Sequence, residues 1–125
     1  MTVTTERTAV VATPSDLMRL HWHRVPGADS VAAKILSAGG GEVAGILIIE
    51  PDGGIEPHTH ATGDHHMYVL EGRCWFGDAL LVEGAYVRVP AGVRHSLRGG
   101  GPSGCRLLYV ASGGVLDPPD AAGTS

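Results

Sequence analysis

Short apolar runs alternate with turn residues along most of the chain. The runs are rich in Val, Ile, Leu and aromatic residues, and they occupy positions 31–36, 43–49, 66–70, 74–76, 79–82, 86–89 and 106–111. Between them lie the segments SAGGG, EPDGG, LEG, VEG, PAG and RGGGPSG, which carry the Gly, Pro or Asp that tight turns require. Short runs at such regular spacing predict an all-β sandwich or barrel.

Helix signals are few. Residues 15–20, SDLMRL, suffice for one helical turn, with Ser15 as its N-cap. The first dozen residues and the last ten lack hydrophobic periodicity, so we expect both ends of the chain to be flexible. The sequence therefore predicts a flexible N-terminal segment over 1–14, a single barrel domain over 15–115 and a flexible C-terminal tail over 116–125.

The composition narrows the class of protein. A chain of 125 residues with 43% hydrophobic and 18% charged residues predicts one soluble globular domain. Its net charge is -4, and its nine Lys and Arg form no basic run, so neither nucleic acid nor an anionic membrane is an expected partner. The N-terminus lacks the basic patch and apolar run of a signal peptide, and no apolar segment approaches the roughly 20 residues of a membrane span. We therefore expect a cytoplasmic protein.

The two cysteines do not form a recognisable motif. Cys74 and Cys105 are far apart in sequence and are not arranged as C-x-x-C. This gives little support to a disulfide, a redox pair or a thiolate metal site. We expect two free, buried thiols.

Histidines carry the candidate chemistry. Five of the seven fall in two clusters, HTHATGDHH starting at His58 and VRH ending at His95. His58 and His60 are two residues apart, so on an extended strand their rings project from one face and can reach the same ion. The turn ATGD then returns His65 or His66 to the first pair. The pattern predicts a histidine metal site.

These residues resemble the two motifs of the cupin superfamily. The first motif, G, a short spacer, H-x-H, three or four residues, usually Glu, six residues and G, and the second, G-x5-P-x-G-x2-H-x3-N, together span residues 53–99. The matching positions are Gly53 or Gly54, His58, His60, His65, Gly72, Gly84, Pro90, Gly92 and His95, with Gly99 where the family often has Asn.

The resemblance implies a single cupin jelly-roll β-barrel, commonly dimeric, with a metal ion in the barrel mouth. It implies His58, His60, His65 and His95 as the metal ligands, where His65 takes the position that is Glu in most cupins. Counting six residues back from Gly72 selects His65, and strand alternation turns His66 to the opposite face; His66 remains the alternative. The segment WHRVPGADSVAAKIL is also similar to anti-sigma-factor-like cupins and small diketone or hydroxyacetophenone dioxygenases.

The expected cofactor is one divalent metal ion. Imidazole ligands suit Fe(II) or Zn(II), and Ni, Mn, Cu and Co are further candidates. The leading hypothesis is a dioxygenase that acts on an enolisable, diketone-like or phenolic small molecule bound as an anion. The alternatives are a Zn-dependent polyketide cyclase or isomerase, in which the ion is a Lewis acid, and a non-catalytic sensor or ligand-binding cupin. The sequence assigns no catalytic residue beyond the metal ligands, and a homodimer is the expected assembly.

Overall fold

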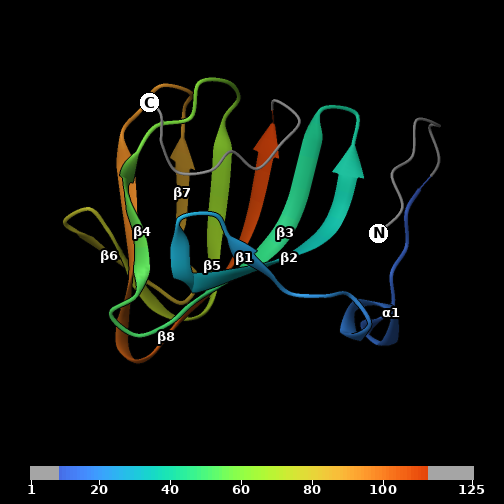
Figure 1. Cartoon of the computed structure of the whole chain (residues 1–125), viewed down its shortest axis with the longest axis horizontal. Coiled ribbons are helices and arrows are strands. Elements are labelled where there is room, and N and C mark those ends of the chain that lie inside the picture. The colour runs from blue at the N-terminus through green and yellow to red at the C-terminus, as the bar shows by residue number, and fades with distance from the viewer. Residues whose placement is uncertain (1–8, 113–125) are drawn as a thin grey trace.

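A computed structural model describes residues 9–112, and this part of the chain is mostly β. One short helix, α1 (Pro14–Met18), precedes eight strands (Figure 1). The strands are β1 (His23–Val25), β2 (Ala28–Gly39), β3 (Glu42–Ile49), β4 (Gly54–His58), β5 (His65–Phe76), β6 (Ala79–Val82), β7 (Tyr86–Val89) and β8 (His95–Ser112). The all-β prediction is confirmed. Residues 1–8 and the expected tail at 116–125 lie outside the described residues.

The strands pair in an order that wraps the sheet around one core. Their sequence in the sheet is β1-β2-β3-β8-β5-β6, while β4 pairs with β8 and β7 pairs with β5. Every one of these strand pairs is antiparallel. The long strands β5 and β8 each bond to several partners, so they join the two sides of the jelly roll seen in Figure 1.

The core follows the two-residue period of the strands. Inward positions along β3 alternate with half-exposed ones, and β5 and β8 repeat the pattern over much of their length. The largest side chains with almost no exposure are Tyr109, Ile49, Leu107, Val31, Val69 and Cys74. Burial of these apolar groups is the main stabilising term for the barrel.

The sequence predicted a turn at LEG, between two strands, and that prediction is wrong. The segment lies inside the continuous strand β5. Gly72 has φ +76°, and the register shifts between Gly72 and Arg73, so the glycine lies at an irregularity within a continuous strand and not in a turn. A Cβ at Gly72 would stand 2.1 Å from the carbonyl oxygen of Gly104, so the backbones approach there more closely than any side chain permits.

The predicted turn RGGGPSG also lies inside a strand, β8. The neighbouring residues Arg73 and Gly72 of β5 pair with Gly100 and Cys105, so residues 101–104 protrude from the ladder. By contrast, the strands expected at 79–82 and 86–89 match β6 and β7. The short strands β1 and β4 were not predicted, because each is only three to five residues long and lacks a run of β-branched residues.

The helical turn exists, but its N-cap is Thr13 and not Ser15. The Thr13 hydroxyl accepts from the Asp16 amide at 3.1 Å, and the Asp16 carboxylate accepts from the Thr13 amide at 3.0 Å. Thr13 and Asp16 thus form a reciprocal capping box, and proline occupies the first helical position. The N-cap therefore lies two residues earlier in the chain than expected. Within residues 9–112, no helix has the length and apolar character needed to cross a membrane.

Candidate metal site

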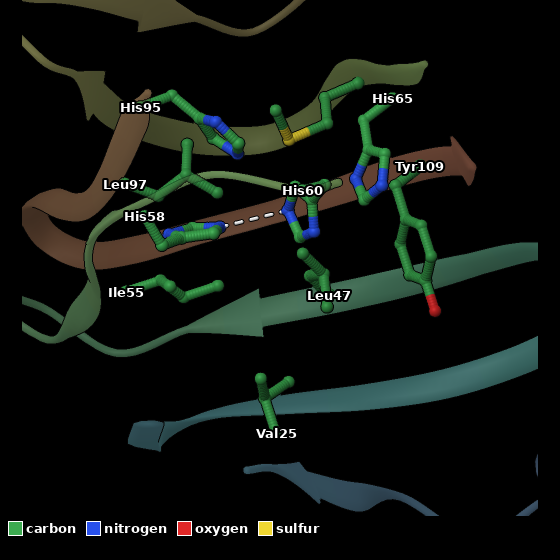
Figure 2. Close-up of a pocket in the computed structure, with 10 residues that line it drawn as sticks. Val25, Leu47, Ile55, His58, His60, His65, His95, Leu97 and Tyr109 are labelled. Carbon is green, nitrogen blue, oxygen red and sulfur yellow. Dashed lines mark hydrogen bonds between the residues drawn. The ribbon is translucent and has the colours of Figure 1, made fainter. Parts of the chain in front are cut away.

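Four histidines meet in one pocket at the ends of three strands. His58 is the last residue of β4, His65 is the first of β5, and His95 is the first of β8. His60 lies just beyond the end of β4, so the shared-strand geometry expected for His58 and His60 holds only in part. All four side chains are buried, with 5 to 7% of their surface exposed. Figure 2 shows the rings turned toward one another.

Three of these rings are spaced as metal ligands require. The ligand atoms of His58, His60 and His95 lie within 4.8 Å of one another, and this group can hold a metal ion. The Nε2 atoms of His58 and His60 are 3.1 Å apart. Two nitrogens bound about 2.1 Å from one ion at 90–109° stand roughly 3.0–3.4 Å apart, so the observed spacing fits neighbouring ligands.

Backbone carbonyls fix the protons on two of the rings. Nδ1 of His58 donates to the Glu56 carbonyl at 2.7 Å, and Nδ1 of His95 donates to the Val93 carbonyl at 2.9 Å. A carbonyl oxygen only accepts, so each ring carries its proton on Nδ1 and presents the lone pair of Nε2 to the pocket. Such a second hydrogen bond orients the ring and is the usual support of a metal-binding imidazole.

His65 shares the pocket but is placed differently. Its ring stacks on that of His60, with centroids 3.9 Å apart and an interplanar angle of 23°. Its Nε2 is buried and has no hydrogen-bond partner among residues 9–112. The three-residue group above does not include it, so a ligand role for His65 stays a prediction. His66 faces the other way, where its Nδ1 lies 2.6 Å from the Tyr86 hydroxyl.

Burial favours the neutral form of these imidazoles. Desolvation is the largest of the causes that lower the pKa of His65 and of His95 from 6.5 to about 4, and it also lowers the pKa of His58. Neighbouring imidazoles contribute to the lowered pKa of His65 and His95, because a second positive charge in the cluster is repelled. At neutral pH these three rings are therefore uncharged, which is the state that coordinates metal.

The rest of the pocket is apolar. Its remaining lining residues are Val25, Leu47, Ile55, Met67, Leu97 and Tyr109. The cavity among these side chains is about 30 Å³, which is room for roughly two water molecules. Among residues 9–112, no carboxylate or amine lines it. Charges in such an apolar site interact strongly, so a divalent cation there would attract an anionic ligand.

The apolar residues of the pocket walls were not predicted, although the two-residue period of the strands could have identified two of them. Met67 lies two residues beyond His65 on β5, and Leu97 lies two beyond His95 on β8. Residues at this spacing share a face of a strand, so both walls could have been placed from the histidines. Tyr109 was only one of several candidate aromatics. It is 2% exposed, and its hydroxyl has no hydrogen-bond partner among the described residues.

The chain resembles known proteins in both sequence and structure. Residues 9–115 match the family model of the ChrR cupin-like domain. No curated protein matches the sequence. Among solved structures, an RmlC-like cupin from Ralstonia eutropha JMP134 aligns with a TM-score of 0.70 and 20% identity, over 85% of this chain and 69% of that one.

This chain aligns with two further solved structures, and it spans a different share of each. The anti-sigma factor ChrR of Rhodobacter sphaeroides, solved in complex with SigE, aligns with a TM-score of 0.66 and 22% identity, over 77% of this chain and 51% of that one. The polyketide cyclase RemF of Streptomyces resistomycificus aligns with a TM-score of 0.65 and 23% identity, over 88% and 89%. At these identities the likeness establishes the fold. The family match over most of the chain shows that it belongs to the ChrR cupin-like domain family of the cupin superfamily.

Proposed function

We propose that this protein is a metal-dependent enzyme that acts on a compact, enolisable or phenolic molecule, and that its reaction is dioxygenation of a diketone-like carbon skeleton. The observation that carries the proposal is the pocket itself, in which four buried imidazoles meet apolar walls and no carboxylate. The protein neutralises none of the charge of a divalent ion held there. An anionic oxygen ligand is therefore the expected partner of the site.

The donor set fits Fe(II) or Zn(II). His58 and His95 present Nε2 lone pairs, His60 completes the group of three, and we propose His65 as the fourth ligand. An ion held by these nitrogens would supply a Lewis acid for an enolate, phenolate or diketonate oxygen. Neutral ligands favour the divalent state of the metal, so the electron-rich substrate anion is the expected source of electrons for dioxygen.

The residues that line the pocket limit the acidity and the size of the substrate. Among the described residues that line the pocket, Tyr109 is the only ionisable one besides the histidines, and burial raises its pKa to about 12, so it remains protonated at neutral pH. Without a general base in the pocket, the substrate must be acidic enough to lose its proton on binding. The aliphatic walls and the narrow cavity favour a compact carbon skeleton over a polycyclic one.

Two other functions have specific support. A Zn-dependent cyclase or isomerase is favoured by the alignment with the polyketide cyclase RemF over 89% of that chain. A metal-binding sensor without catalysis is favoured by the match to the ChrR cupin-like domain, although this chain spans about half of the ChrR structure. Both alternatives use the same histidines, so they differ from the first in metal and reaction and not in site.

One experiment separates the dioxygenase from the other two functions. Protein purified without added metal is subjected to elemental analysis, and oxygen uptake is then measured with pentane-2,4-dione as the probe. Iron together with uptake is the expected result. Zinc without uptake, in a protein that also remains inactive when loaded with Fe(II), would refute dioxygenation and leave the cyclase or the sensor.

The ligand assignment needs matched variants. His58→Ala, His60→Ala and His95→Ala are each expected to abolish stoichiometric metal binding and to keep the β-rich circular dichroism spectrum, since the core strands do not depend on the imidazoles. His66→Ala is the control, because His66 lies on the outer face of β5. Normal metal content in any of the first three variants would remove that residue from the site.

We also propose a homodimer. The outer face of β5 and β7 exposes Tyr68 and Tyr86, which are 43% and 58% exposed and are paired in the strand register. Exposed aromatic pairs of this kind are common at protein interfaces. Light scattering during size-exclusion chromatography measures the mass directly, and Tyr68→Glu is expected to shift the protein toward the monomer. A monomeric wild type at micromolar concentration would refute the dimer.

A further inference from the structure

Two loops determine where two of the metal-site histidines lie. Residues 59–64 contain His60, residues 90–94 lead into His95, and neither loop belongs to a strand. Ligands on loops are placed less precisely than ligands on strands unless other contacts fix the loop. One exposed side chain, that of Asp64, bonds across the junction between these two loops.

The Asp64 carboxylate uses both of its oxygens at this junction. Its Oδ1 accepts from the Ala91 amide at 3.3 Å, and its Oδ2 accepts from Nη2 of Arg88, on β7, at 2.6 Å. The Gly92 amide donates to the His60 carbonyl at 2.9 Å, so a backbone bond joins the same two loops. The loop that contains His60 is therefore held to the second loop through its backbone and through a carboxylate.

The backbone of Asp64 is anchored independently of its side chain. Its amide donates to the Ser112 hydroxyl and its carbonyl accepts from the Ser112 amide, both at 3.0 Å. Ser112 is the last residue of β8, so these bonds hold Asp64 to a strand of the sheet. A substitution of the Asp64 side chain leaves this anchor in place and removes only the contacts of the carboxylate.

The turn that Asp64 contacts also orients one of the histidine rings. The Val93 carbonyl accepts from Nδ1 of His95 at 2.9 Å, which fixes the direction of the ring. The Val93 amide donates to the Pro90 carbonyl at 3.2 Å and closes a tight turn. The bond from the Ala91 amide to Asp64 therefore holds the turn whose carbonyl orients His95.

We propose that Asp64 is a positioning residue for the metal site, and that its carboxylate keeps the loop of His60 at a fixed spacing from His95. This role rests on the metal site of the proposed function and not on the reaction there. Asp64 does not line the pocket, so it acts on an ion only through the two loops. The ligand atoms of His60 and His95 lie within 4.8 Å of each other, and loops already held at this spacing lose less conformational freedom when an ion binds.

The contact should matter more for metal binding than for the stability of the fold. The Asp64 and Arg88 side chains are 35% and 53% exposed, and solvated ion pairs contribute little to stability. The chain offers a matched control in the exposed pair of Glu71 on β5 and Arg106 on β8, with a nitrogen–oxygen distance of 3.8 Å. Neither of these two residues belongs to the loops or lines the histidine pocket.

The test uses the full-length chain, stripped of metal and titrated with Zn(II) against a chromophoric chelator. Asp64→Ala should weaken Zn(II) binding by about tenfold, the lower end of the range for residues that orient metal ligands. Asp64→Asn keeps an acceptor for the Ala91 amide and should lose less affinity. Glu71→Ala should bind Zn(II) as the wild type does. Without metal, all three variants should melt within about 4 °C of the wild type, because each loses only exposed contacts.

The visible spectrum of the Co(II)-loaded protein adds a readout that a change in stability alone would not move. Its bands depend on the arrangement of the ligands around the ion. At saturating Co(II), Asp64→Ala should show bands of altered position or intensity, and Glu71→Ala should show those of the wild type.

Three results would overturn the role of Asp64 and leave the metal site intact. The first is that no folded Asp64 variant binds Zn(II) more weakly than Glu71→Ala. The second is a Co(II) spectrum of Asp64→Ala that superimposes on that of the wild type. The third is weaker Zn(II) binding by Asp64→Asn than by Asp64→Ala. A wild-type protein that binds neither ion would overturn the metal site itself together with this role.

Discussion

Acid should unfold the metal-free protein over a pH range set by its buried histidines. Burial lowers the pKa of His65 and His95 from 6.5 to about 4, so the unfolded chain binds more protons than the folded one between these values. The stabilising effect of the neutral rings is complete above pH 6.5 and is lost as the pH falls toward 4.

The size of the effect follows from the two pKa values. Each pH unit below 6.5 removes about 1.4 kcal/mol of unfolding free energy per histidine, so at pH 5 the two rings together remove about 4 kcal/mol. Domains of this size are stable by roughly 5–15 kcal/mol, so the loss is a large share of the total.

Urea unfolding followed by far-UV circular dichroism measures this loss, with the protein kept in EDTA at pH 7.5, 6.5, 5.5 and 5.0. We expect the free energy to stay level to pH 6.5 and then to decrease steeply. His95→Gln removes one buried imidazole and should reduce the slope by about 1.4 kcal/mol per pH unit, which is the contribution of one ring. His66→Gln, the control, keeps all of the buried rings and should keep the slope.

The reasoning fails if the unfolding free energy of the metal-free wild type changes by less than about 1 kcal/mol between pH 6.5 and pH 5, because the buried rings would then take up protons without penalty. It also fails if His95→Gln leaves the slope unchanged. With saturating Zn(II), the metal competes with protons for the same nitrogens, so the steep region should move to lower pH.

Three further predictions concern single residues. His65→Glu should keep the metal but bind an anionic chelator such as tropolone more weakly, as measured by calorimetry, because the added carboxylate reduces the charge of the site; equal or tighter binding contradicts the charge argument. Gly72→Ala should lower the unfolding free energy by at least about 3 kcal/mol, because it places a Cβ 2.1 Å from a backbone oxygen at positive φ; a normal melting temperature would refute this. Tyr109→Phe should stabilise the protein by about 1 kcal/mol in urea unfolding by removing a buried hydroxyl without a partner in the described part of the chain, and a destabilised variant would show that this hydroxyl is satisfied.

The sequence predicted the strands wherever a β-rich run ended at a turn that reverses the chain. That condition holds for β6 and β7, whose bounds agree with the expected ones. It fails at Gly72, where a glycine that is typical of a turn lies instead at a register shift inside β5. Propensity does not distinguish these two uses of a positive φ, because the choice depends on the partner strand β8.

The histidine cluster could be located from spacing and resemblance, and the structure does bring the four rings into one pocket. The exact donor set could not be derived, because the stacking of His65 on His60 depends on where the loop after β4 runs. The register of β8 against β5 was also beyond the sequence, because it depends on the protrusion of residues 101–104.

The position of the histidines at strand ends has a consequence for folding. His58, His65 and His95 belong to β4, β5 and β8, and these strands pair only across long stretches of chain. In the unfolded chain His95 is therefore far from the cluster at residues 58–65, and the complete site forms only when the barrel closes. A metal ion that binds the closed barrel adds stability as RT ln(1 + [M]/Kd), about 4 kcal/mol at a thousandfold excess over Kd. In a cell, the supply of free metal would then set how much stability the barrel gains beyond that of its metal-free form.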